Sequence, residues 1–209
     1  MDYRTIIEPA TAEYVIERSR FLTLAAPVSD EAEAQAVVAA QRKKYFDARH
    51  HCSAWILGED SSKQKSSDDG EPGGTAGMPI LDVIKRKGLT NVVVVVTRYF
   101  GGIKLGAGGL VRAYSHSAAL GLDAAKTAVN ADFMRLAVAV AYPLLGSVEN
   151  YLRQHNVRVA DTSYADDVTF ELLVPPDEVQ ALTDELTNLT AANAEIIELG
   201  TERLLLEEN

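Results

Sequence analysis

The sequence predicts an α+β protein of two domains, the first formed by residues 1–133 and the second by residues 134–209. Short segments with strand periodicity alternate with segments of helical periodicity, and this pattern starts afresh near Phe133. Charge is also divided: residues 1–135 hold 17 Lys and Arg against 16 Asp and Glu, whereas residues 136–209 hold 3 against 14. Contact with nucleic acid would therefore use the first part of the chain.

The first 65 residues contain alternating apolar and polar residues and one helical period that begins at Asp30, a good N-cap residue. They predict two strands, a helix, a third strand and a polar, mobile loop, at residues 5–7, 14–24, 30–45, 51–57 and 58–65.

Two glycine-rich segments follow, at residues 68–77 and 101–109, and 10 of the 14 glycines of the chain lie between residues 67 and 114. Such clustering indicates backbone that adopts positive φ or lies close to a ligand or another chain. Between the segments, residues 78–84 predict a short helix, and the β-branched run at 91–97 predicts a buried strand.

The second segment connects that strand to a helix whose apolar residues recur from Leu110 to Leu122. Free N–H groups at a helix start, with cations nearby, favour phosphate or carboxylate. The alternative is a tight connection that needs glycine only to turn. The segment matches neither a Walker loop nor a dinucleotide fingerprint. The candidate anion or nucleic-acid site comprises Arg98, Gly101, Gly102, Lys104, Gly106, Gly108, Arg112 and His116.

The first segment combines acids with flexible residues. Its carboxylates could bind a divalent cation or accept backbone hydrogen bonds, but the EF-hand register requires an acid at Ala76. A solvated acidic turn is the alternative. Pro72 and the surrounding glycines favour a loop of defined shape. The candidate residues of this loop are Asp69, Glu71, Gly73, Gly74 and Thr75.

His50, His51 and Cys52 are all zinc-ligand types, but neighbours on a strand point to opposite faces, so only two of them could converge. No second ligand pair is suitably spaced, so we expect no metal and no cofactor, and the role of the three residues stays open. No nucleophile elbow, zinc-protease helix or deaminase pattern occurs, so an enzyme is the less favoured class. In an enzyme, Asp69, Glu71 and His116 would be the candidate acids and bases.

The two segments read SSDDGEPGGTAGMPIL and VTRYFGGIKLGAGGLVRAYS, 36 residues in all. They resemble the twin signatures of the YigZ/IMPACT family, and the two-part layout is similar to that of its bacterial members. The resemblance implies a first domain like domain IV of elongation factor G, with a ribosomal-protein-like fold, and a ferredoxin-like second domain like domain V of that factor. Eukaryotic relatives act in translational control through an additional partner-binding domain, which this sequence does not contain.

The second domain has the order βαββαβ on periodicity alone, which is the split ferredoxin arrangement. Its strands are expected at 136–142, 157–164, 168–174 and 196–206, with helices after Pro143 and Pro176. This domain holds little catalytic chemistry, and its acidic surface suits a protein partner.

A single cysteine, no signal pattern and no apolar run of membrane length predict a cytoplasmic protein without membrane contact. The favoured function is translation-associated regulation, with RNA or the ribosome bound at the basic glycine-rich site. The alternative is an enzyme or sensor that binds a small phosphorylated or carboxylate ligand at the same loops.

Overall fold

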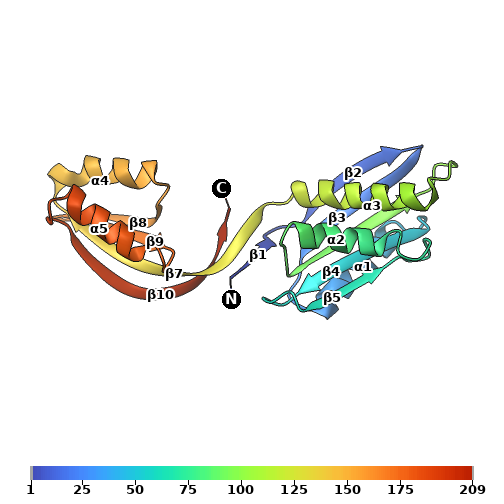
Figure 1. The fold of residues 1–209 in the computed structure, drawn as a ribbon, viewed down its shortest axis with the longest axis horizontal. Coiled ribbons are helices and arrows are strands. Elements are labelled where there is room, and N and C mark those ends of the chain that lie inside the picture. Colours follow the sequence, from blue (N-terminus) through green and yellow to red (C-terminus); the bar gives the residue numbers. More distant parts are fainter. Residues whose placement is uncertain (1, 209) are drawn as a thin grey trace. The chain divides into compact units, whose positions relative to one another are not determined.

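The computed structural model describes residues 2–208, which form two compact units (Figure 1). One unit contains the chain up to Asn130 together with the residues from Leu205 onward, and the other contains Ala131–Leu204. Each unit has its own antiparallel pairing and its own helices, so the predicted two-domain α+β class is confirmed. None of the helices within residues 2–208 is both long and apolar enough to cross a membrane.

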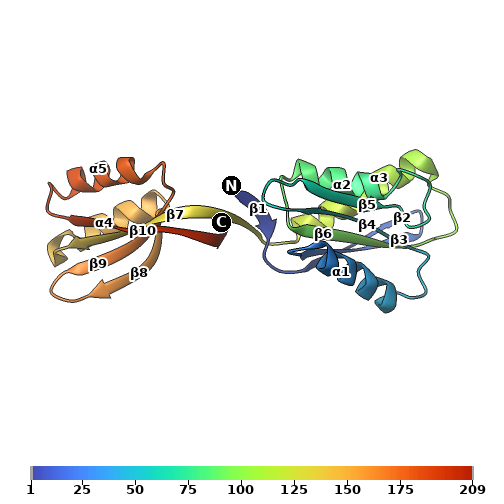
Figure 2. The same ribbon diagram turned by 90° about the horizontal axis from the view of Figure 1, so that it is seen from below.

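The first unit is built on a five-stranded antiparallel sheet with α1 (Glu31–Lys44) on one face and two helices, α2 (Gly77–Arg86) and α3 (Gly106–Asp123), on the other (Figure 2). The strands, in sheet order, are β2 (Ala10–Ile16), β3 (Ser19–Pro27), β6 (Val92–Tyr99), β4 (His50–Leu57) and β5 (Lys63–Ser67).

The valine run of β6 is explained by its central place in this sheet. Successive side chains of a strand point to opposite faces. Val92, Val94 and Val96 accordingly enter the core beneath α2 and α3, whereas Val93 and Val95 pack with residues of α1 on the other face. Because helices cover both faces, every position of the run is apolar, and the predicted buried strand is observed.

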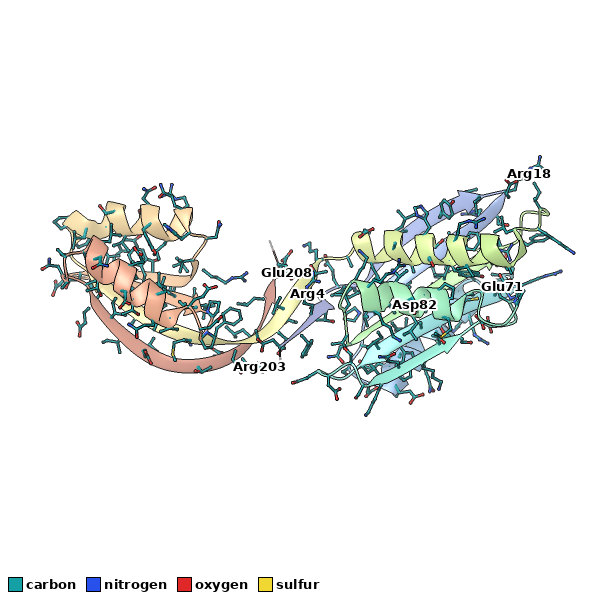
Figure 3. All side chains as sticks on the ribbon, viewed as in Figure 1. Arg4, Arg18, Glu71, Asp82, Arg203 and Glu208 are labelled. Atoms are coloured by element: carbon teal, nitrogen blue, oxygen red, sulfur yellow. The ribbon has the colours of Figure 1, made fainter. Side chains whose placement is uncertain are left out.

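One short strand pairing and one ion pair complete this unit. Strand β1 (Tyr3–Ile6) pairs with the first residues of β7 (Thr127–Val140), with Tyr3 opposite Asn130. Arg4 donates through Nε and Nη2 to the two carboxylate oxygens of Glu208, each at 2.8 Å, and both residues are labelled in Figure 3.

The second unit has the predicted βαββαβ order. Its strands are β7, β8 (Arg158–Tyr164), β9 (Val168–Val174) and β10 (Glu195–Glu207), and its helices are α4 (Tyr142–Gln154) and α5 (Val179–Leu189). Strand β7 lies between β9 and β10. Alternate residues of β9 are buried and form one core with residues of both helices.

Three expectations for the first unit were wrong. Residues 14–24 are not one strand, because Glu17 and Arg18 adopt positive φ angles of 46° and 62° and turn the chain from β2 into β3. The polar stretch at 58–65 already contains the start of β5, an edge strand that needs few apolar residues. Gly106 and Gly108 belong to the first turn of α3 rather than to the preceding loop.

Candidate functional site

The first glycine-rich segment is organised by Asp68. Its carboxylate accepts hydrogen bonds from the backbone N–H groups of Gly74 (2.8 Å), Ala76 (3.0 Å) and Gly77 (2.8 Å). Burial raises the pKa of this carboxyl, but the bonds from Gly74, Gly77 and Ala76 together outweigh it, so the net pKa lies below the ordinary value. Asp68 thereby supplies the N-terminal hydrogen-bond acceptor of α2 from outside the helix.

Residues at the start of β4 also form hydrogen bonds with the first glycine-rich segment. His50 Nδ1 donates to the carbonyl oxygen of Asp69 at 2.8 Å, and the backbone N–H of His51 donates to the Asp69 carboxylate at 2.6 Å. Cys52 Sγ donates to the Asp68 carbonyl oxygen at 3.0 Å, and burial raises the pKa of the thiol to about 12. Within residues 2–208 no group of three or more acids, histidines or cysteines is placed to hold a metal ion. The observed role of these three β4 residues is to position the acidic segment.

Glu71 is nearly buried, and two side chains donate to its Oε1. Arg98 Nη1 and the Tyr114 hydroxyl each lie 2.7 Å away, and the Arg98 and Glu71 side chains are only 7% and 4% exposed. The Arg98 guanidinium also lies over the rings of Phe21, at 5.5 Å, and Phe100, at 5.6 Å. Glu71 therefore joins the first glycine-rich segment to β6 and α3.

These contacts correct the expectation for three residues. The charge of Arg98 is neutralised by Glu71 inside the protein, so Arg98 is not a free anion ligand. Asp69 bonds to Arg42 and to the backbone of His51, so neither expected acid is available as a general base or a cation ligand. The carboxylates of the acidic turn are bonded within the protein, whereas Gly70 and residues 72–74 are exposed to solvent. The turn is a clasp, formed by residues 68–77, that connects β4, β6, α2 and α3. Asp68 and Asp69 accept backbone hydrogen bonds, as one of the two expectations had it, whereas Glu71 accepts hydrogen bonds from side chains.

Of the remaining loop candidates, Thr75 and Gly74 stabilise this clasp, and Gly73 shows no such contact. Thr75 is buried, and its hydroxyl donates to the Pro72 carbonyl oxygen at 2.7 Å. Gly74 adopts φ of +76°, which lets its N–H reach Asp68. Gly73 is exposed, and a Cβ atom there would meet nothing within 4 Å.

In the second segment, Gly101 is required by a close approach of two backbones. A Cβ atom there would lie 2.0 Å from the carbonyl carbon of Arg18 and 2.4 Å from the Ser19 nitrogen. The Gly101 N–H donates to Ser19 Oγ at 3.1 Å. Gly102 follows with φ of +87°. This pair therefore fixes the segment against the β2–β3 turn, which ends at the labelled Arg18 in Figure 3.

The exposed cations Arg49, Lys104 and Arg112 line two adjoining hollows at the end of the unit where the β2–β3 turn lies. We call the first, of roughly 390 Å³, the Phe100 hollow, and the second, of roughly 600 Å³, the Arg112 hollow. The Phe100 hollow is lined by Arg49, His50, Glu71, Pro72, Arg98, Phe100, Lys104, Leu105, Gly106, Ala107 and Leu110. The Arg112 hollow is lined by Tyr14, Ile16, Glu17, Ile103, Lys104, Leu105, Gly109, Arg112, Ala113 and His116.

Both glycine-rich segments thus border the Phe100 hollow, and Lys104 and Leu105 border both hollows. Lys104 and Arg112 are exposed, and within residues 2–208 neither forms an ion pair. His116 is exposed on the same side of α3 as Arg112, with its ring edge-on to Tyr14 at 4.5 Å. Arg112 and His116 occupy the places that helical spacing predicted, and Lys104 lies in the loop before α3.

Sequence reasoning missed Phe100 and Arg49. Phe100 lies between the end of β6 and the Gly101–Gly102 pair, and half of its surface is exposed. An aromatic residue next to glycines that already looked functional was an available signal. Arg49, directly before β4, carried none, because only the fold places it beside the second segment.

Two family models match the chain. The Impact N-terminal domain matches residues 17–122, and a domain of unknown function, DUF1949, matches residues 138–193. The chain is 43% identical over 197 residues to IMPACT family member YvyE of Bacillus subtilis, which covers 94% of this chain and 90% of that protein. It is 33% identical over 191 residues to IMPACT family member YigZ of Escherichia coli, with 90% and 94% covered.

A crystal structure described as that of a hypothetical protein gives a TM-score of 0.61 at 31% identity, over 95% of this chain and 98% of that one. Both glycine-rich segments, their clasp and the Phe100 hollow fall inside the matched Impact N-terminal domain, and the Arg112 hollow does so except for Tyr14 and Ile16. Since the first model matches half of the chain and the full-length relatives match nearly all of it, the chain belongs to the YigZ/IMPACT family as a two-domain bacterial-type member.

Proposed function

We propose that this protein acts in translation-associated regulation by binding RNA, free or within the ribosome, at the two hollows around Lys104. The translational part rests on family membership, since eukaryotic relatives act in translational control. The observation that carries the RNA-binding part is that two hollows share Lys104 and Leu105 and continue to Arg112.

A surface of this kind suits a polymeric anion. Lys104 can contact one phosphate and Arg112 another, because both are exposed and neither is neutralised within residues 2–208. Exposed N–H groups in the first turn of α3, at Gly106 and Ala107, add a favourable dipole for a phosphate. Successive phosphates of one strand would then lie along one track, from the Phe100 hollow to the Arg112 hollow.

The overall charge of −10 opposes unspecific attraction to nucleic acid. Affinity must therefore come from these few local contacts. The acidic second domain repels phosphates and suits a protein partner instead. Few contacts imply modest affinity with a clear dependence on salt.

A small phosphorylated or carboxylate ligand is the second candidate. One observation favours it: the Phe100 hollow alone, at roughly 390 Å³, has the size of an ordinary small-ligand site. Catalysis is the less favoured form of this candidate, because Glu71 and Asp69 are already bonded within the protein.

The test replaces Lys104 and Arg112 together by alanine and measures RNA affinity by fluorescence anisotropy at several salt concentrations. We expect affinity at low salt to fall about tenfold or more, and the slope of log K against log salt to lose about one unit per removed cation.

The matched control replaces Lys85 and Arg86, two exposed basic residues in the last turn of α2 that border neither hollow. Equal affinity and equal slope in both double variants would contradict the proposed function. Saturable binding of inorganic phosphate by a protein without RNA affinity would support the small-ligand candidate instead.

A further inference from the structure

Resting on the proposed RNA-binding function, we propose that the Phe100 hollow holds one unstacked base of a single strand, with the base on the Phe100 ring and its phosphate at Lys104. The ligand class is then single-stranded RNA rather than a duplex or a free anion.

The Phe100 ring is held in place although it is half exposed. It is 50% exposed, and the Arg98 guanidinium lies 5.6 Å from its ring centroid. That guanidinium is itself placed over Phe21 at 5.5 Å and fixed by Glu71 at 2.7 Å. The layers Phe21, Arg98 and Phe100 therefore support the outer ring from inside the protein. A supported aromatic ring with free surface is the arrangement on which nucleobases stack.

The surroundings of the ring suit a nucleotide. Pro72, Leu105 and Leu110 supply apolar lining, and Arg49 and Lys104 are exposed cations at the same hollow. Because His50 Nδ1 donates to Asp69, its Nε2 is left as an acceptor for an amino or imino group of a base. The charges of the buried Glu71 and Arg98 cancel. The positive charges of Arg49 and Lys104 remain at the hollow, and they favour the anionic sugar–phosphate backbone of a nucleic acid.

Other ligands use this arrangement less well. Bases in a duplex are stacked on each other and present only their edges, so they cannot lie on a protein ring. A free phosphate can form an ion pair with Lys104, but it gains no affinity from the Phe100 ring, because it has no base to stack there. The ring thus distinguishes a splayed single strand from both alternatives.

The test compares Phe100→Ala and Phe100→Trp with the unchanged protein, using a short single-stranded RNA and a fully paired RNA duplex of the same length. We expect Phe100→Ala to weaken single-strand binding about tenfold. For this variant the slope of log K against log salt should stay unchanged, because the contacts to phosphate remain. Phe100→Trp should restore the affinity. Phe46→Ala is the control, since Phe46 is 84% exposed and borders neither hollow.

Each outcome separates this inference from the proposed function. If Phe100→Ala leaves single-strand affinity unchanged while the Lys104 and Arg112 double variant weakens it, the stacking inference is overturned and RNA binding stands. If Phe100→Trp fails to restore affinity in a protein that folds normally, the ring is not a stacking surface. If the unchanged protein binds neither RNA, both proposals fail.

Discussion

Replacing Glu71 by alanine is expected to lower the free energy of unfolding of the first unit by about 3–5 kcal/mol. The change removes the counter-charge of Arg98, a residue that is only 6% exposed. Arg98 Nε is already buried without a hydrogen-bond partner, and the bond from Nη2 to Ser19 Oγ is long at 3.5 Å, so neither replaces the lost counter-charge. The buried hydroxyl of Tyr114 loses its acceptor in the same step.

Urea unfolding followed by tryptophan fluorescence measures this effect, because Trp55, the single tryptophan of the chain, is buried in β4 of the first unit. Asp82→Ala is the matched control, since Asp82 is exposed on α2 and should change stability by no more than about 0.5 kcal/mol. Adding Arg98→Met to Glu71→Ala should recover much of the loss, because the unpaired charge is then gone. Equal stability of Glu71→Ala and Asp82→Ala would show that the clasp is not held by this pair.

Replacing Gly101 by alanine is expected to cost about 1–3 kcal/mol of stability and to weaken RNA binding as well. The added Cβ atom would overlap the carbonyl carbon of Arg18, 2.0 Å away, and no side-chain rotation can relieve a clash with backbone. Either the β2–β3 turn or the segment must shift. Phe100 and Lys104, on either side of Gly101 in sequence, would move with the segment.

Gly73→Ala separates this effect from the general loss of a glycine. Gly73 has no positive φ and no neighbour within 4 Å of an added Cβ atom, so alanine there should be neutral or slightly stabilising. Thermal unfolding and RNA anisotropy on both variants make the comparison. Identical behaviour of the two variants would mean that the contact between Gly101 and Arg18 is not needed.

Patterns of neighbouring residues predicted the parts of the fold that depend on local periodicity. The valine run of β6 and the alternation of β9 identify buried strands, because burial on two faces or on one face leaves a distinct pattern. Helical spacing likewise placed Arg112 and His116 on the exposed side of α3. The turn at Glu17 and Arg18 was missed, because neither residue type is typical of positive φ.

The pairing of charges could not be predicted in the same way. Arg98 and Glu71 are 27 residues apart, and several other cations and acids lay as near in sequence to either of them. Which acid meets which base depends on how β6, α3 and the first segment pack together. The sequence therefore indicated the right segments but assigned Arg98 and Glu71 to a ligand instead of to each other. Phe100 differs, because its place beside the glycines was a signal in the sequence and only its support by Arg98 depends on the folded chain.

The most direct test of the central claim, that RNA binds around Lys104, is an NMR titration of the full-length, ¹⁵N-labelled protein with a short single-stranded RNA. We predict the largest amide shifts between Phe100 and Leu110, with further shifts at Arg112 and His116. Shifts confined to residues 131–204, or no shifts while RNA is in excess, would contradict the account.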